Sequence, residues 1–504
     1  MTRQDQSTVI IPNHRFLQDH RFLGRAVLPA AEALGLLADM AAKSLHEDDV
    51  LFSCDAEFKR FLYLPDSINK LEARIEIQPE GEASVRTTLK TITRGKKTAV
   101  TRAKDHVTVC FGVPQSIPSL PMDVACALVG VPFKLSADLL YKELVPFGSS
   151  YHNCDGDLYL NPKGVMAKIV APEHPNLSSS LGSPFVFDAA LHAANAWGQR
   201  YLGIVAFPTG YEKRFIFKPT LAGQHYLCHA IPGLKDPNEL SFDIWIFHVD
   251  GQLCEAIVGQ KMRDLSAGRM KPPQWIVAES EDDFEALRTI CADITVVDNQ
   301  TLAPFAALAL TEAEAIRGKK MKPKRLVQFT AARIALKRLA RRHLKLGDTL
   351  NARSIETVSF NLDKPGIVIN GERKGVYCSA SHTDRFTFAA MDNAPIGVDV
   401  EKVTDRALQN KRLFMSDAEK RLVMKSSLGH FEASTRIWTI KEAYAKASDI
   451  GLATAWKRVE VTRVGKFESV FLIDDRQSIA VHSAVNDHIF TLVKLFKGIS
   501  GTRH

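Results

Sequence analysis

Apolar positions at helical spacing open the chain and are followed by alternating stretches. Residues 26–42 carry leucines and a methionine at helical spacing, which predicts a helix with one buried face. Residues 73–92 and 102–113 then alternate apolar and polar side chains, as antiparallel strands with one buried face do. We therefore expect residues 1 to about 115 to form an α+β half, in which one helix packs on a sheet.

The same order of patterns returns further along the chain. A helix is predicted near residues 188–202, and alternating runs follow between residues 214 and 262. The repeat is one of pattern and not of identity. It predicts a duplicated α+β unit whose second half covers about residues 125–265.

Proline-rich segments divide the chain into regions. Residues 112–123 separate the two halves, and residues 266–274 form a linker between the duplicated unit and the rest. From Trp275 onward the pattern is mixed again, with long helices predicted near residues 325–345 and 434–448. We expect a further domain from residue 275 to residue 504.

Composition indicates a globular protein. The 504 residues are 45% hydrophobic and 24% charged, and no apolar stretch approaches the roughly 20 residues that cross a bilayer. The first residues show no basic cap followed by an apolar block, so we predict no secretory signal and a cytoplasmic location. The eight cysteines form no CxxC pair, which argues against a structural zinc site and a disulfide framework.

The net charge of +8 resides in one segment. Residues 317–345 hold 12 Lys or Arg and no acid, so the remainder of the chain is slightly acidic. Such a segment attracts an anion, which could be a nucleic acid, an acidic protein surface or a multiply phosphorylated small molecule.

His20 and Asp188 are candidate catalytic residues because they lie at matching places, each at or just before the helix of its half. Taken singly, a lone histidine is more often structural, and Asp188 could be a helix N-cap. A pseudo-twofold arrangement of the halves would bring both to one cleft. There His20 could take the α-proton of a thioester while protonated Asp188 donates to a departing β-hydroxyl. An apolar cleft would raise the pKa of Asp188 and keep it protonated.

The first 265 residues resemble the dehydratase domains of polyketide synthases and related polyunsaturated fatty acid synthases. The HxxxGxxxxP motif appears as His20, Gly24 and Pro29, and the DxxxQ/H motif as Asp188 and His192. The resemblance implies a double hot-dog fold, a 3-hydroxyacyl carrier-protein thioester as substrate, and a homodimer formed through this domain. It implies further that His192 orients Asp188 or the substrate hydroxyl.

Three carboxylates in the second half predict a magnesium site. Asp399 and Glu401 are two residues apart in an alternating stretch, so a strand would present both on one face. Glu442 lies in a predicted helix with Trp438 and Lys446 at intervals of four. Separately, a polar strand face and an ordinary amphipathic helix explain these patterns. Together they suit Mg²⁺, a cation that takes carboxylate oxygens, beside a diphosphate.

These segments resemble the surfactin-synthetase type of 4′-phosphopantetheinyl transferases over about residues 275–500. The family motif (V/I)G(V/I)D(V/I)E appears as GVDVE, and WxxKExxxK as Trp438, Lys441, Glu442 and Lys446. The resemblance implies two pseudo-twofold subdomains, about 275–395 and 396–500. It also implies that coenzyme A donates phosphopantetheine to a carrier-protein serine. Mg²⁺ would bind Asp399, Glu401 and Glu442, Glu442 or its water would deprotonate the serine, and Lys446 would offset diphosphate charge.

The resemblance also implies contacts to coenzyme A. Ser381 and His382 would hold its 3′-phosphate, and Lys364 and Pro365 would flank its adenine. The full set of candidates is Arg317, Lys320, Arg325, Arg333, Lys364, Pro365, Ser381, His382, Lys441 and Lys446.

The combined interpretation is a bifunctional enzyme of polyketide or fatty acid biosynthesis. It joins a 3-hydroxyacyl carrier-protein dehydratase to a transferase of the holo-acyl-carrier-protein synthase type. The chain has no carrier-protein serine motif, so an acyl carrier protein is expected to act in trans.

Other interpretations remain open. Ser149 stands where the dehydratase family has proline, which favours a non-catalytic docking module in place of the dehydratase. Double-bond isomerisation would need the same base. A nucleic-acid binder would explain the basic segment but not the carboxylates, and Phe329 alone gives that segment no aromatic stacking platform. We therefore expect neither a nucleic acid nor a membrane as partner.

Overall fold

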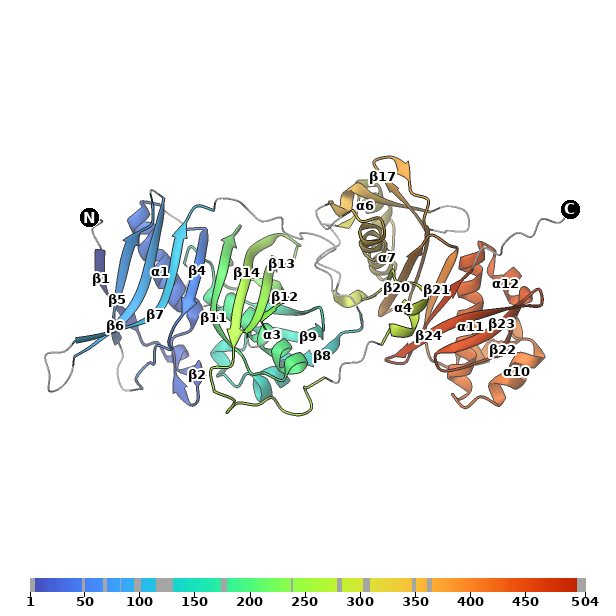
Figure 1. Ribbon diagram of the computed structural model, residues 1–504, viewed down its shortest axis with the longest axis horizontal. Coiled ribbons are helices and arrows are strands. Elements are labelled where there is room, and N and C mark those ends of the chain that lie inside the picture. Colours follow the sequence, from blue (N-terminus) through green and yellow to red (C-terminus); the bar gives the residue numbers. More distant parts are fainter. Residues whose placement is uncertain are drawn as a thin grey trace. The chain divides into compact units, whose positions relative to one another are not determined.

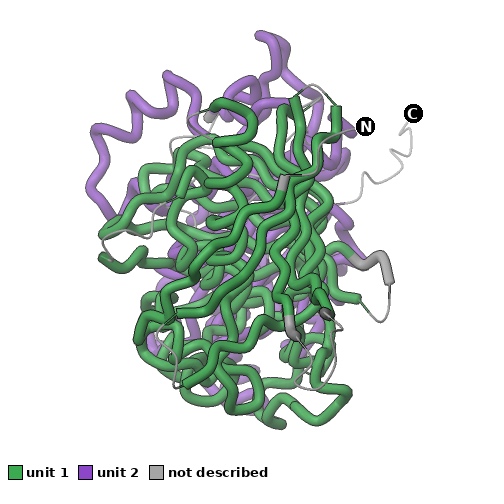
Figure 2. The backbone as a smooth tube through the Cα atoms, turned by 90° about the vertical axis from the view of Figure 1, so that its left-hand side faces the viewer, with its two compact units in different colours: residues 1–118, 132–280 green, residues 119–131, 281–504 purple. Residues whose placement is uncertain are grey.

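The computed structural model divides the chain into two compact units (Figures 1 and 2). Unit 1 comprises Met1–Pro118 and Pro132–Ser280, and unit 2 comprises Ser119–Val131 and Glu281–His504. The structure describes residues 5–47, 50–66, 70–81, 83–94, 101–114, 130–173, 179–236, 239–278, 283–301, 309–346, 350–359 and 365–495. Most of the predicted break at residues 112–123 therefore lies outside the described residues.

Unit 1 is built from one twelve-stranded antiparallel sheet and two long helices, α1 (Ala30–Leu45) and α3 (Pro184–Leu202) (Figure 1). The strands follow the order β1 (Asp5–Pro12), β5 (Lys70–Pro79), β6 (Ser84–Arg94), β7 (Thr101–Gly112), β4 (Phe52–Phe58), β11 (Phe207–Ile216), β14 (Leu253–Arg263), β13 (Glu239–His248), β12 (His225–Asp236), β10 (Gly164–Val170), β9 (Cys154–Asn161) and β8 (Phe133–Ser136). Because β4 pairs with β11, the sheets of the two halves are continuous.

The two helices form the core of unit 1 together with the inward side chains of the sheet. All residues from Phe185 to Gln199 of α3 are buried, and a helix enclosed on every side needs the small and apolar side chains found there. In β7 the core residues Val107, Val109 and Phe111 alternate with outward positions, as predicted. One helix and one multi-stranded sheet, twice over, is the α+β double hot-dog arrangement that the sequence resemblance implied.

Unit 2 contains two halves, each with a long helix against an antiparallel sheet. The first half has α4 (Glu285–Ile290), β15 (Ile294–Asp298), α6 (Glu312–Gly318), α7 (Pro323–His343), β16 (Ile355–Ser359), β17 (Pro365–Ile369), β18 (Glu372–Arg373), β19 (Tyr377–His382) and β20 (Phe386–Asp392). The second has β21 (Ile396–Lys402), α8 (Arg406–Gln409), α9 (Lys411–Phe414), α10 (Asp417–Met424), α11 (His430–Ser448), α12 (Leu452–Arg458), β22 (Val459–Arg463), β23 (Glu468–Ile473), β24 (Arg476–Val485) and β25 (His488–Lys494). No helix in the described ranges of the chain is both long and apolar enough to cross a membrane.

The two halves of unit 2 each contain a buried ion pair between a capping-box glutamate and a lysine of the long helix. In the first half, Glu314 belongs to the capping box of α6 and binds the Lys337 ammonium of α7 at 2.6 Å. In the second, Glu419 belongs to the capping box of α10 and binds Lys441 of α11 at 2.8 Å. The shared placement of these pairs on matching helices supports the predicted duplication.

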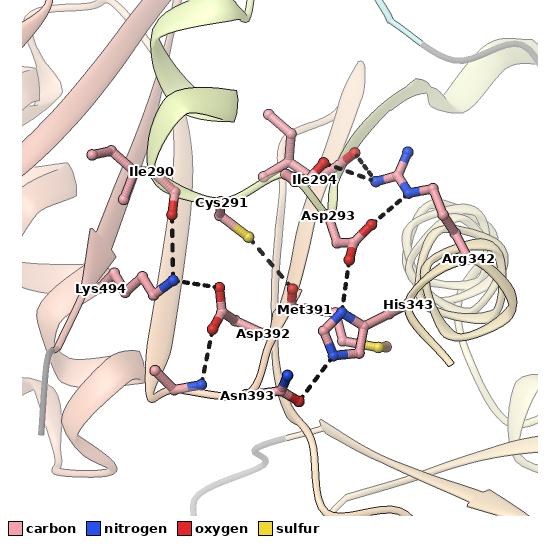
Figure 3. A network of polar contacts seen from close by, with 12 residues as sticks. Ile290, Cys291, Asp293, Ile294, Arg342, His343, Met391, Asp392, Asn393 and Lys494 are labelled. Carbon is pink, nitrogen blue, oxygen red and sulfur yellow. Dashed lines mark hydrogen bonds and ion pairs between the residues drawn. The ribbon is translucent and has the colours of Figure 1, made fainter. Parts of the chain in front are cut away.

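A polar network joins the halves at one end of α7 (Figure 3). The Arg342 Nε and His343 Nδ1 atoms bind the two oxygens of Asp293 at 2.6 and 2.7 Å, just before β15. Beside them, Lys494 at the end of β25 donates to Asp392 at the end of β20, over 2.8 Å. The network therefore fixes the last strand of the second half to the last strand of the first.

Candidate active sites

The HxxxGxxxxP motif of unit 1 forms a tight hairpin that presents His20. Gly24 has φ +79° in the turn between β2 (Arg21–Phe22) and β3 (Arg25–Ala26), a conformation that favours glycine. After the hairpin, the Val27 N–H donates to the His20 carbonyl at 2.9 Å, and Pro29 caps α1. The spacing of the motif thus places His20 beside the start of the helix.

The orientation of His20 leaves one ring nitrogen free to act as a base. Its Nδ1 lies 3.2 Å from the Val27 carbonyl oxygen, so Nδ1 carries the hydrogen and donates. Nε2 then bears the lone pair and lies 3.8 Å from Asp188 Oδ1. The rings of Phe147 and Tyr151 pack against the imidazole, with centroids at 4.3 and 5.1 Å.

Tyr141 determines the tautomer of His192. The Tyr141 hydroxyl oxygen accepts the N–H groups of Asn153 at 3.0 Å and Cys154 at 2.9 Å. Both of its lone pairs are then occupied, so its hydrogen points to His192 Nδ1, 3.4 Å away. His192 therefore carries its own hydrogen on Nε2, which lies 3.0 Å from Asp188 Oδ2.

The charge state of this group differs from the sequence prediction in one respect. Burial lowers the pKa of His20 below 6.5, and the attraction of Asp188 offsets this only in part. For Asp188, burial alone would raise the pKa, but His192 and His20 together outweigh it and hold that pKa below its usual range. The expected rise was wrong because it counted the apolar cleft and omitted the two imidazoles. The resting group is a neutral His20 facing an Asp188 carboxylate.

These residues line a cavity of about 310 Å³ within unit 1. Its other walls are mainly apolar and include Phe22, Leu23, Phe61, Phe147, Leu191 and Met262. The volume and the mainly apolar lining suit an apolar chain that ends in a reacting group.

The segment around Ser149 is ordered without the proline of the family motif. Asp19 Oδ2 accepts the Ser150 N–H at 3.1 Å and the Ser150 hydroxyl at 2.6 Å. A Cβ on Gly148 would lie 2.6 Å from Asp19 Cβ, so glycine alone allows this approach. Asp19 therefore holds the loop that places Phe147 against His20.

In unit 2, β21 and α11 bring the three predicted carboxylates together. Lys446 Nζ lies 2.7 Å from Asp399 Oδ1 and 3.8 Å from Glu442 Oε2, and it donates to the Val398 carbonyl at 3.1 Å. Burial and the Asp399 charge raise the pKa of Glu401 to about 7 and that of Glu442 to about 8. Each carboxylate is thus close enough to destabilise the charge of the others.

A glycine makes the approach of β21 to α11 possible. A Cβ on Gly397 would lie 2.6 Å from the Ala447 nitrogen and closer still to the Ala443 carbonyl oxygen. The glycine of the GVDVE motif therefore lets the strand contact the helix backbone directly. This contact positions Asp399 opposite Glu442 and Lys446.

The carboxylate group fits a divalent cation chemically. Asp399 Oδ2 is buried and has no hydrogen-bond partner among the described residues. The raised pKa values of Glu401 and Glu442 come from burial first and from the Asp399 charge second, and a bound cation would offset both. As they stand, no three His, Cys, Asp or Glu side chains in the described part of the chain are arranged to hold a metal. The Lys446 ammonium is paired with Asp399 Oδ1, so a bound ion would share the site with this ammonium.

Two further predicted residues lie beside this group. Ser381 donates its hydroxyl to Asp399 Oδ1 at 2.7 Å, and His382 Nε2 lies 2.6 Å from Arg325 Nη1 at the start of α7. The site therefore extends from the carboxylates along β19 to the basic helix.

Lys441 lies away from this site. It is 1% exposed and donates to Glu419 Oε2 at 2.8 Å and to the carbonyl oxygens of Phe414 and Trp456 at 2.6 and 3.4 Å. Successive helix positions point about 100° apart, so Lys441 faces the core while Glu442 faces the site. A coenzyme A contact from Lys441 does not agree with this placement.

The remaining predicted contacts are spread along the first half of unit 2. The guanidinium carbons of Arg317 and Arg333 lie 5.6 and 4.4 Å from the Phe329 ring centroid, and Lys320 is exposed. Pro365 is half-buried at the start of β17, and Lys364 lies outside the described residues.

Sequence reasoning missed two groups near His20. No spacing or charge pattern in the sequence singles out Tyr141. Glu32 did have a signal, since it is a carboxylate in the apolar stretch that forms α1. Its Oε1 atom is buried without a hydrogen-bond partner in the described ranges, and burial and Asp188 raise its pKa to about 7.

Comparison with known proteins agrees with the carboxylate site. The description of the 4′-phosphopantetheinyl transferase superfamily matches residues 395–493, which include β21 and α11. The chain is 30% identical over 118 residues to 4′-phosphopantetheinyl transferase Sfp of Bacillus subtilis, and the match covers 21% of this chain and 52% of Sfp. It is 28% identical over 79 residues to the 4′-phosphopantetheinyl transferase gsp of Aneurinibacillus migulanus. This match covers 15% of this chain and 33% of that transferase. The chain thus spans at most about half the length of these curated relatives.

Unit 1 is similar to solved dehydratase domains. The dehydratase domain from the CurJ module of curacin polyketide synthase is 18% identical, with a TM-score of 0.43, over 52% of this chain and 92% of that domain. A dehydratase domain of a mycocerosic acid synthase-like polyketide synthase is 14% identical, with a TM-score of 0.43, over 52% of this chain and 93% of that domain.

Proposed function

We propose that unit 2 transfers 4′-phosphopantetheine from coenzyme A to a serine of an acyl carrier protein supplied in trans. The observation that supports this is the approach of Asp399, Glu401 and Glu442 to one another beside Lys446. Bound Mg²⁺ would supply positive charge to the coenzyme A diphosphate at these carboxylates. The holo-acyl-carrier-protein synthase type of activity is part of this proposal.

In this proposal the residues of the chain position the reactants and handle the proton. Glu442, or a water that it holds, accepts the proton of the attacking serine. Lys446 neutralises charge on the diphosphate as the bond to 3′,5′-ADP breaks. His382 and Arg325, 2.6 Å apart at the end of β19, would bind the 3′-phosphate.

Mass spectrometry of an apo carrier protein tests the transferase. The full chain, coenzyme A and Mg²⁺ should add the mass of one phosphopantetheine, and the product should disappear with Glu442→Gln. Glu372→Gln removes an exposed carboxylate that pairs with Lys374 and should leave the activity unchanged. No mass gain with several carriers would refute the proposal.

For unit 1 we propose dehydration of a 3-hydroxyacyl carrier-protein thioester. The observation that supports it is the His20–Asp188–His192 group on an apolar cavity of about 310 Å³. His20 Nε2 takes the α-proton. Because Asp188 is ionised at rest, it would take up one proton as the substrate binds and donate that proton to the departing hydroxyl, while His192 orients it.

A dehydration assay separates this function from a docking role. Wild type should convert the thioester to its enoyl product, whereas His20→Ala should lose about 10²- to 10⁴-fold in rate. His46→Asn, an exposed histidine at the end of α1, is the matched control. No turnover by wild type would favour the docking module, and a shifted double bond in the product would favour isomerisation.

A homodimer through unit 1 and a cytoplasmic location complete the proposal. Sedimentation of the full chain tests the dimer, and a single species of one chain's mass would refute it.

A further inference from the structure

Two cysteines lie opposite each other on neighbouring strands of unit 1. Cys54 in β4 and Cys110 in β7 are directly paired in the antiparallel register. Such pairs have Cα atoms about 4.5–5.5 Å apart, within the span of about 4.4–6.8 Å that a disulfide bridges. Both are free thiols. The sequence alone did not predict this pair, because the two residues are far apart along the chain.

The pair lies on the outer face of the sheet. Val109 and Phe111 of β7 point into the core, so Cys110 between them points outward, and it is 6% exposed. Cys54 is more accessible, because a register shift follows it in β4 and Asp55 adopts φ +51°. An incoming reagent therefore reaches Cys54 first.

The surroundings of the pair distinguish the two thiols. The adjacent Cys110 side chain and the nearby Arg86 charge lower the pKa of Cys54. Cys110 lies 3.3 Å from Glu80 Oε2 and keeps its proton, since Cys54, burial and Glu80 all raise its pKa. A partly accessible thiol with a lowered pKa, directly opposite a second thiol that keeps its proton, is the arrangement of redox-sensitive cysteines.

We propose that Cys54 and Cys110 form a redox-active dithiol that low-molecular-weight disulfides oxidise to an intramolecular disulfide. The Cys54 thiolate attacks one sulfur of the small disulfide, forms a mixed disulfide and releases one thiolate, which takes up a proton. Cys110 then loses its proton and attacks the Cys54 sulfur, which releases the second thiol. Two electrons pass from the protein to the small disulfide, and two small thiols are formed.

The bond would fasten β4 to β7 across the sheet. β4 lies between β7 and β11 and joins the two halves of unit 1, and the segment after it includes Phe61, which lines the cavity beside His20. Oxidation should therefore raise the unfolding temperature of unit 1, because it closes a loop between residues 54 and 110.

Glutathione disulfide tests the proposal on the full chain. After incubation and trapping of free thiols, peptide mass spectrometry should find Cys54 joined to Cys110, and dithiothreitol should reverse the link. Cys110→Ser should accumulate a glutathione adduct on Cys54, while Cys54→Ser should leave Cys110 unmodified. Cys254→Ala, a buried cysteine of the same unit, should form the link like wild type.

Either of two results would overturn the proposal. One is that both thiols of the wild type remain reduced in excess glutathione disulfide, over a range of glutathione ratios. The other is that wild type keeps a stable glutathione adduct on Cys54, as Cys110→Ser does. None of these readouts depends on either proposed enzymatic activity.

Discussion

Gly397→Ala tests whether the contact between β21 and α11 sets the geometry of the transferase site. The added Cβ would lie 2.6 Å from Ala447 N, whereas ordinary contacts begin at 3.4 Å. The strand must therefore move away by at least about 0.8 Å, and further to clear the Ala443 carbonyl oxygen. A displacement of about 1 Å at a catalytic constellation costs roughly 10²-fold in rate. Overpacking should also destabilise unit 2 by about 1–3 kcal/mol.

The rate is measured as phosphopantetheine transfer by mass spectrometry, and the stability as hydrogen exchange of α11 in the full chain. Gly375→Ala is the matched control, because no described residue lies within 4 Å of its added Cβ. It should keep wild-type activity and exchange. A Gly397→Ala variant with wild-type transfer rate and wild-type exchange would refute the inference that direct backbone contact positions Asp399.

Three further predictions concern buried groups. Because the pKa of His20 lies below 6.5, the dehydration rate should hold down to that pH and fall only below it; a midpoint above 6.5 in the pH–rate profile would contradict this. Tyr141→Phe leaves the N–H groups of Asn153 and Cys154 without their acceptor. It also removes the hydroxyl that donates to His192 Nδ1, so the His192 hydrogen is no longer held on Nε2. It should cost about 1–3 kcal/mol in thermal unfolding and roughly tenfold in rate; if neither changes, Tyr141 does not determine the His192 tautomer. Lys441→Met should destabilise unit 2 by about 3–5 kcal/mol, because it leaves Glu419 buried and unpaired; unchanged stability with a raised KM for coenzyme A would instead support a ligand role.

Much of the candidate site could be predicted from local spacing. The alternation around GVDVE placed Asp399 and Glu401 on one strand face, and the helical period placed Glu442 and Lys446 together. The long helices were also predictable, because their apolar residues recur at helical spacing. The prediction placed the second helix of unit 1 near residues 188–202, whereas it begins at Pro184.

Residues that depend on a distant partner were not predictable in this way. Lys441 and Lys446 belong to the same motif, yet one meets Glu419 in the core and the other meets Asp399 in the site. The pKa of Asp188 falls because the imidazoles of His192 and His20 face it across the cleft, and burial alone would have raised it. In both cases the neighbouring charge comes from the folded arrangement of the chain.

The sequence by itself determined the elements, the order of the two units and the residue types of both candidate sites, because helix and strand periods are local properties. Tertiary structure alone decided which charges meet. It placed Cys54 opposite Cys110 and supplied Tyr141 to His192. The physical reason is that hydrogen bonds and ion pairs act over a few ångströms, and only folding brings residues far apart in the sequence within that range.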